Sequence, residues 1–366
     1  MTDTAPALKE IFNPARLRHI ADELAAVAPG VDGARFLAAA LVNLDALSVM
    51  ERLRQVAKSL RLVLPDDYDA ALVILRALAP RLNHGFAAMA LSDYVALCGL
   101  EAFDASMAAL ADLTRFGSSE FAVRYFLRRD LDRGLAIMTQ WAQSPDEHVR
   151  RLASEGSRPR LPWSFKLADI IADPGRIAPI LGTLKTDPSL YVRRSVANSL
   201  NDITKDSPEH ALALAESWPQ DHAHTRWIVR HALRSLIKKG DPRALKLIGI
   251  ADRADVVVED LRVTPDKVRI GGRVSIGFVL RSTVPDDQTL VVDYVVHYVK
   301  KSGAASGKVF KLKTVSLPGG ARVAVAKTQA LTDFTTRTHY AGVHRIEIQV
   351  NGRRLAETAF ELEEAL

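Results

Sequence analysis

A helical unit repeated in the middle of the chain constrains the fold more than any other feature of the sequence. Aligned on the valine before a central arginine, its copies lie 43 and then 37 residues apart: EHVRRLASEG (147–156), LYVRRSVANSL (190–200) and RWIVRHALRSL (226–236). Such spacings are typical of paired-helix repeats of the HEAT type, in which every second helix lines one concave wall. Apolar residues recur at helical spacing from residue 11 to about 250. We therefore predict an all-α helical-repeat solenoid over residues 1–252.

Each copy of the repeat carries an arginine after the aligned valine, at Arg150, Arg193 and Arg230. In a solenoid these side chains would stack as a ladder. They could tie neighbouring helices to acidic loop residues, or they could contact phosphate. The adjacent Arg151 and Arg194 lie a step further round the helix, where they are better placed to reach solvent or DNA.

The pattern changes after residue 255, where β-branched and aromatic residues alternate in about seven short runs separated by Gly, Pro and Asn. This alternation predicts strands, and Asn351-Gly352 predicts a tight hairpin between the last two runs. Seven strands in roughly 110 residues favour an immunoglobulin-like β-sandwich over residues 256–366. Several lysines in these runs could contact an anion or protect an edge strand from aggregation: Lys300, Lys301, Lys308, Lys311 and Lys313.

The positive charge is concentrated in the middle of the chain. Residues 120–250 hold 21 basic and 15 acidic side chains, whereas residues 1–119 hold 11 and 14. A basic centre indicates a surface for a polyanion such as nucleic acid, or else a solvated helical face. No apolar run approaches the ~18 residues of a membrane span, and the first residues do not resemble a leader, so we expect a cytoplasmic protein. The single cysteine, Cys98, excludes a disulfide within the chain.

Residues 148–163, HVRRLASEGSRPRLPW, combine groups that packing alone does not require. The helical pattern stops at Gly156 and prolines follow, so Glu155 is predicted at the end of a helix. The loop that follows brings two guanidinium groups and an aromatic ring close to this carboxylate: Arg158, Arg160 and Trp163. A carboxylate, phosphate-seeking arginines and a flat ring suit a damaged nucleotide better than they suit a hydrophobic core.

Three segments give the chain a resemblance to a known family: SSEFAVRYFL (118–127), SEGSRPRLPW (154–163) and VRRSVANSLND (192–202). The chain resembles the HEAT-like DNA alkylation-repair glycosylases, and within them the AlkC branch, some members of which carry a C-terminal immunoglobulin-like domain. The resemblance covers nearly the whole chain. One departure is Tyr125, which stands where the family pattern leads us to expect proline.

The resemblance implies a monofunctional DNA glycosylase that removes cationic N3-methylated bases, 3-methyladenine and 3-methylcytosine, from duplex DNA. Such a base already weakens its glycosidic bond and needs no protonation by an enzyme acid. The enzyme must stabilise an oxocarbenium-like sugar and place a water, and carboxylates do both. Carried over by motif, Glu155 is the water-positioning base or electrostatic stabiliser, and Glu120 and Asp202 face the lesion or the sugar.

Each carboxylate also has a structural interpretation. Glu155 could pair with Arg151 one helical turn earlier. Asp202 is predicted just past the end of its helix, where it could cap the next one. Glu120 could be a first-turn acid favoured by the helix dipole, with a serine before it as cap.

The remaining candidates would bind DNA around these carboxylates. Trp163 could be part of the core, or its ring could pack on a deoxyribose or a base. Phe121 has the same two interpretations. Arg151 is predicted to bind the substrate. Backbone contacts are predicted for Arg158 and Arg160, which alternate along the loop and so point to the same side, and for Arg193 and Arg194.

We expect no metal, no small-molecule cofactor, no membrane and a monomer, with duplex DNA as the partner. The histidines near residues 210–231 lack the cysteine or acidic partners of a recognisable metal site. The other interpretation is a non-catalytic HEAT-repeat scaffold that binds nucleic acid or a protein partner. Substitution of Glu155 by Gln distinguishes the two interpretations, because only the glycosylase needs the Glu155 carboxylate.

Overall fold

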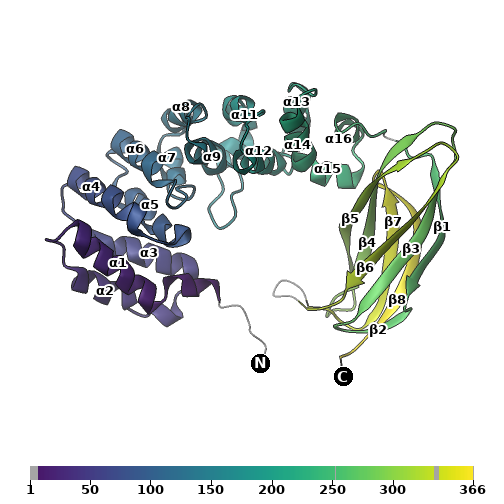
Figure 1. Cartoon of the computed structure of the whole chain (residues 1–366), viewed down its shortest axis with the longest axis horizontal. Coiled ribbons are helices and arrows are strands. Elements are labelled where there is room, and N and C mark those ends of the chain that lie inside the picture. The colour runs from purple at the N-terminus through teal and green to yellow at the C-terminus, as the bar shows by residue number, and fades with distance from the viewer. Residues whose placement is uncertain (1–6, 252, 334–337, 366) are drawn as a thin grey trace. The chain divides into compact units, whose positions relative to one another are not determined.

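Helices fill the chain as far as Leu247, and strands follow from Val256 (Figure 1). The computed structural model describes residues 7–251, 253–333 and 338–365. The order of elements confirms the predicted fold, a helical-repeat region followed by an immunoglobulin-like β-sandwich. Within the described residues, no helix is both long enough and apolar enough to cross a membrane.

The α-helices are short and run in chain order. Their bounds are α1 Pro14–Val27, α2 Gly33–Leu41, α3 Val49–Arg61, α4 Tyr68–Leu78, α5 Gly85–Cys98, α6 Phe103–Leu113, α7 Val123–Arg129, α8 Leu131–Trp141, α9 Glu147–Gly156, α10 Ala168–Ala172, α11 Ala178–Leu184, α12 Leu190–Ile203, α13 Pro208–Glu216, α14 Ala223–Ala232, α15 Arg234–Lys239 and α16 Pro242–Leu247. Short 3-10 turns lie between some of them: Leu8–Phe12, Leu44–Ala46, Ala79–Arg81 and Pro174–Ile177.

Polar side chains at the helix starts explain many of these bounds. Ser48 and Glu51 form a capping box at the start of α3, each bonding to the backbone of the other. Other helices begin where a side-chain oxygen accepts a hydrogen bond from a backbone N–H of the first turn: Asn13, Asp32, Asp67, Asp130, Asp146 and Asp241.

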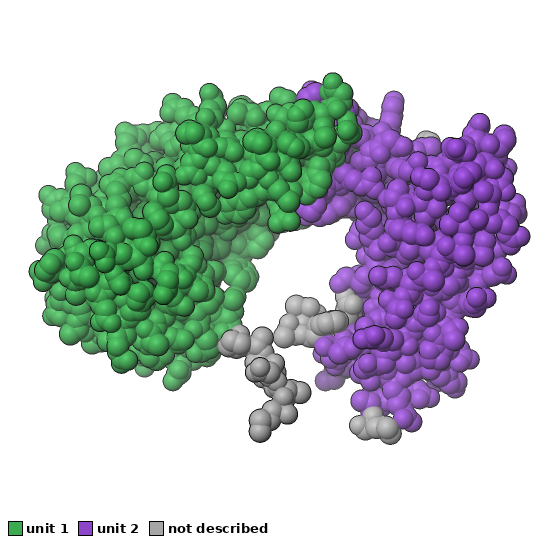
Figure 2. Space-filling view, viewed as in Figure 1, with its two compact units in different colours: residues 1–214, 221–228 green, residues 215–220, 229–366 purple. Residues whose placement is uncertain are grey.

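The chain divides into two compact units (Figure 2). The first comprises residues 1–214 and 221–228, and its helices pack in two layers. In one layer α4 packs on α6, and α8 on α11, whereas in the other α3 packs on α5, and α9 on α12 (Figure 1). This alternation is the arrangement expected of paired-helix repeats.

The second unit comprises residues 215–220 and 229–366, so it includes the last helices as well as the strands. Lys238 of α15 donates to the Val309 carbonyl over 3.3 Å, and Arg230 donates to Thr314 Oγ1 over 2.6 Å. The boundary predicted between residues 252 and 256 coincides with the change from helix to strand. The boundary between the two compact units lies earlier in the chain, because the last helices pack with the strands. That domain division stays a prediction.

In the described part of the chain, eight strands form two sheets, one strand more than the sequence predicts. They are β1 Val256–Thr264, β2 Lys267–Arg269, β3 Arg273–Ser282, β4 Gln288–Val299, β5 Ala305–Leu317, β6 Arg322–Ala330, β7 Gly342–Val350 and β8 Arg353–Glu363. The sheet orders are β1-β3-β6 and β2-β8-β7-β4-β5, and one apolar core draws on strands of both sheets. The additional short strand, β2, pairs in parallel with β8.

Two details of the sandwich follow from the sequence. Asn351 and Gly352 both have positive φ, 45° and 80°, and connect β7 to β8. Positive φ at both central residues is what a tight type I′ hairpin requires, so the predicted turn is confirmed. β5 is an edge strand and exposes Lys308, Lys311 and Lys313, as expected of lysines that protect an edge.

Candidate active site

The loop that follows α9 begins at a tightly packed glycine. α9 includes Gly156, and a Cβ there would lie 2.4 Å from Val123 Cγ1 of α7, so only glycine lets the two helices approach this closely. Glu155 lies in the last turn of α9, as predicted. Beyond Pro159 the chain runs as a loop to the start of α10.

A buried arginine from the FAVR segment holds this loop in place. Arg124 donates from Nη1 to the carbonyls of Gly156 and Arg158, at 3.0 and 2.6 Å, and from Nη2 to the carbonyl of Phe165. Its side chain is fully buried, and burial together with the nearby Arg158 charge lowers its pKa to about 10. Sequence analysis did not single out Arg124. The signal was present, since an arginine between buried apolar positions needs several acceptors.

Arg158 joins two of the three predicted catalytic carboxylates. Its Nη1 lies 2.7 Å from Glu155 Oε1, and its Nε lies 2.9 Å from Asp202 Oδ2. All three side chains are buried, at 5% exposure for Glu155, 1% for Asp202 and 8% for Arg158. Lys205 completes the group with Nζ 2.9 Å from Asp202 Oδ1. Both oxygens of Asp202 therefore contact a cation.

The third carboxylate joins the same network through Arg151. Its Nη1 lies 2.7 Å from Glu120 Oε2, and its Nη2 lies 3.8 Å from Glu155 Oε1. Ser118 Oγ also donates to Glu120 Oε2, over 2.7 Å. We call these six charged residues the carboxylate network, in which three anions alternate with three cations: Glu120, Arg151, Glu155, Arg158, Asp202 and Lys205.

The structural alternatives for the carboxylates fare differently. Glu155 does approach Arg151, but its shorter contact is with Arg158. Asp202 lies in the last turn of α12 rather than past its end, and its side chain binds Arg158 and Lys205, so the predicted position was wrong. Glu120 precedes α7 by three residues, and that helix has no side-chain cap, so the first-turn interpretation was also wrong.

The electrostatics keep Glu155 ionised at neutral pH. Burial acts to raise the pKa of this carboxyl, but the Arg151 and Arg158 guanidinium groups outweigh it and hold the pKa below its ordinary value of 4.5. A buried carboxylate with this charge environment can stabilise a developing positive charge or accept a proton from water.

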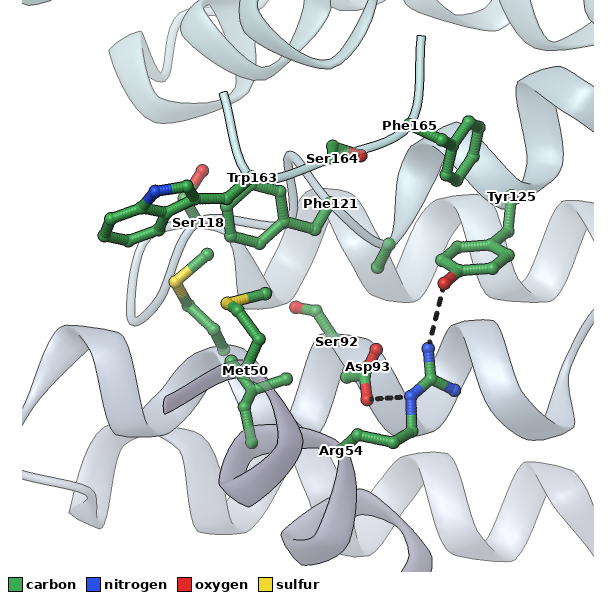
Figure 3. A pocket seen from close by; sticks show the side chains of 13 residues that line it. Met50, Arg54, Ser92, Asp93, Ser118, Phe121, Tyr125, Trp163, Ser164 and Phe165 are labelled. Atoms are coloured by element: carbon green, nitrogen blue, oxygen red, sulfur yellow. Dashed lines mark hydrogen bonds and ion pairs between the residues drawn. The ribbon is translucent and has the colours of Figure 1, made fainter. Parts of the chain in front are cut away.

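Aromatic side chains flank the network. Trp163 lies on the loop with φ of 63° and is 62% exposed, so it is available to a ligand rather than part of a core. Phe121 is half-buried and lines a cavity together with Trp163 (Figure 3). Tyr191, which sequence analysis missed, is exposed and places its ring 4.5 Å from the Arg151 guanidinium carbon. The feature of the sequence that could have identified Tyr191 is its position at the start of a repeat helix.

The arginines predicted to contact the DNA backbone occupy different environments. Arg194 is exposed, as predicted. Arg160 pairs with Asp206 through two nitrogens, and Arg158 is buried between carboxylates. The two loop arginines therefore both face acidic groups near the end of α12. Their contact with phosphate stays a prediction.

Arg193 and its counterparts serve the repeat. Arg150, Arg193 and Arg226 each donate to the carbonyl five residues earlier, at 2.9, 2.7 and 2.6 Å. In the third copy, the residue equivalent to Arg150 and Arg193 is therefore Arg226. Arg230 lies one helical turn later and contacts Thr314 on β5 instead. The predicted ladder was wrong at Arg230, because the alignment of the three copies on their valines displaced the third copy by one helical turn. Among the described residues, no group of three His, Cys, Asp or Glu side chains could hold a metal.

Comparison with known proteins identifies the family. The structure superposes on Pseudomonas fluorescens alkylpurine DNA glycosylase AlkC bound to DNA containing an abasic site analog, with a TM-score of 0.95 and 54% identity, over 98% of this chain and 100% of that one. The chain belongs to the AlkC family. It is also 39% identical to the Bacillus subtilis (strain 168) protein YhaZ over 346 residues, which cover 94% of this chain and 96% of that protein. Residues 257–364 match the family model described as the C-terminal Ig-like domain of uncharacterised protein YhaZ.

Proposed function

We propose that this chain is a monofunctional DNA glycosylase that hydrolyses the N-glycosidic bond of cationic N3-methylated bases, 3-methyladenine and 3-methylcytosine, in duplex DNA. The observation that carries the proposal is the carboxylate network, in which Arg151 and Arg158 join the three predicted carboxylates. The relation to AlkC, an alkylpurine DNA glycosylase, supports the same reaction class.

The network suggests a division of roles. Both arginine contacts of Glu155 fall on Oε1, so Oε2 is the oxygen that would accept a proton from the attacking water. Asp202 binds cations through both oxygens and would position Arg158. Glu120 would position Arg151 in the same way. Arg158 itself would act as a positioning residue for Glu155 rather than as a phosphate clamp.

The reaction needs no acid from the protein. Water bonds to the sugar carbon and loses its proton to Glu155, while the electrons of the broken C–N bond neutralise the departing cationic base. The ionised Glu155 stabilises the oxocarbenium-like sugar as it forms. Neutral bases such as uracil lack this weakened bond, so efficient uracil excision would contradict the mechanism.

A lyase reaction is not part of the proposal. The amine that belongs to the network is that of Lys205, which pairs with Asp202 and is half exposed. A lysine that forms a Schiff base needs a desolvated amine. DNA cleavage should therefore follow base release only after separate treatment of the abasic site.

The test is release of free base from a duplex with one 3-methylcytosine and from methylated DNA rich in 3-methyladenine. Glu155→Gln should abolish release and keep DNA affinity. Glu147→Gln, in the first turn of the same helix and exposed, is the matched control and should release base normally. No release by the wild type from either substrate, with DNA binding retained, would favour the non-catalytic scaffold.

A further inference from the structure

A cavity of about 240 Å³ opens in the first unit, and Figure 3 shows side chains that line it. One wall comes from α3 and α5, and the other from residues 118–125 and the loop after α9. Ser118 belongs to both features, because it lines the cavity and its Oγ donates to Glu120. An occupant of the cavity would therefore lie one side chain away from Glu120 of the carboxylate network.

Flat and polarizable side chains dominate the lining. Phe121 and Trp163 lie at one end of the view and Tyr125 and Phe165 at the other (Figure 3). The Tyr125 and Phe165 rings meet edge to face with centroids 5.3 Å apart. Met50 also lines the space. Rings and thioethers offer stacking surfaces for a planar heterocycle.

Three serines and one ion pair make part of the lining polar. Arg54 Nε lies 2.9 Å from Asp93 Oδ2, and Arg54 Nη2 donates to the Tyr125 hydroxyl over 3.1 Å. The pair has no net charge, yet it offers guanidinium donors and a carboxylate acceptor. Burial raises the pKa of Asp93 to about 6 despite Arg54, in keeping with a carboxyl largely shielded from water. Such a site favours a neutral heterocycle with donors and acceptors along its edge over an ion.

We propose that this cavity binds the neutral methylated base after its release from DNA. The inference rests on the proposed glycosylase function, since hydrolysis turns a cationic lesion into a neutral base that the ionised Glu155 carboxylate no longer attracts. The volume of about 240 Å³ is far larger than the ~10–15 Å³ that one water needs. It falls below the roughly 300 Å³ at which drug-sized pockets begin, so the cavity suits a base rather than a nucleotide.

Isothermal titration of free 3-methyladenine into the full chain tests the proposal. The wild type should bind one equivalent, and Asp93→Asn and Tyr125→Phe should each bind about tenfold more weakly, because the first replaces a charged acceptor by a neutral amide and the second removes a hydroxyl. Asp112→Asn is the matched control, since Asp112 pairs with Arg76 on the surface and does not line this cavity. Adenosine should bind more weakly than the base, because the cavity is smaller than a drug-sized pocket.

Three results would overturn the inference: no saturable binding of 3-methyladenine by the wild type, affinities in both cavity variants equal to that of the control, or adenosine binding as tight as that of the base. Tyr125→Phe keeps the ring, so the test survives if Asp93→Asn fails to fold. Base release from DNA is measured separately. A wild type that releases base but does not bind it contradicts only this inference, whereas one that binds base but releases none contradicts the proposed function.

Discussion

Arg158 and Asp202 lie 44 positions apart in the sequence, yet Arg158 Nε is 2.9 Å from Asp202 Oδ2. The contact joins the loop after α9 to the last turn of α12. Because the same guanidinium also binds Glu155, one arginine fixes the spacing of two carboxylates from neighbouring repeats. The site is thus assembled across the repeat boundary.

Substitution of Arg158 should lower the free energy of unfolding more than substitution of a surface arginine. Arg158→Gln leaves two buried carboxylates without their shared cation, and we expect a loss of about 3–5 kcal/mol in the free energy of unfolding. Denaturant unfolding measures it. The control is Arg160→Gln, whose partner Asp206 is at the surface and whose loss should cost at most ~1 kcal/mol. Equal effects of the two substitutions would contradict the buried network.

The pH dependence of base release should follow Glu155. Its pKa is held below 4.5, so it stays ionised as pH falls from neutrality, and single-turnover release should decline only below that value. In the Arg158→Gln variant, one of the two guanidinium groups that offset the burial of Glu155 is missing. The pKa of Glu155 should therefore rise, and the acid limb of the profile should move to higher pH. A pH–rate profile from about pH 8 to about pH 4 tests this. An unchanged acid limb in the variant would show that Arg158 does not position Glu155.

Salt dependence separates exposed arginines from buried ones. Arg194→Ala should reduce the slope of log affinity against log salt by about one unit if it meets a phosphate, because one fewer counterion is released. Arg158→Ala should leave that slope unchanged, since its side chain is buried between carboxylates. A reduced slope for Arg158→Ala would restore the clamp predicted from the sequence.

The loop should depend on Arg124. Arg124→Met removes the donors to three loop carbonyls and should lower the free energy of unfolding by about 3 kcal/mol. It should also speed proteolysis between Gly156 and Phe165. The control is Arg129→Met on the same helix, where the arginine is exposed and pairs with Glu101 instead of the loop. Equal protease sensitivity of the two variants would show that Arg124 does not hold the loop.

Local features of the sequence determined the elements. Helical spacing, the alternation of β-branched and aromatic residues, and the Asn351-Gly352 turn act within a few residues, so they predicted the helical repeats, the sandwich and its last hairpin. The end of α9 at Gly156 and the exposure of Trp163 followed from the same local rules. Resemblance to a family added the three carboxylates.

Tertiary structure alone decided what those carboxylates contact. The sequence placed Arg158 on a loop and favoured solvent and phosphate, but packing of the loop against α12 brought Asp202 to it, and a buried guanidinium needs anionic partners. Tyr191 and Arg124 escaped notice for the same reason, because their partners come from other helices. Spacing along a chain predicts which way a helix faces, but only the packing of one repeat on the next determines which charges meet.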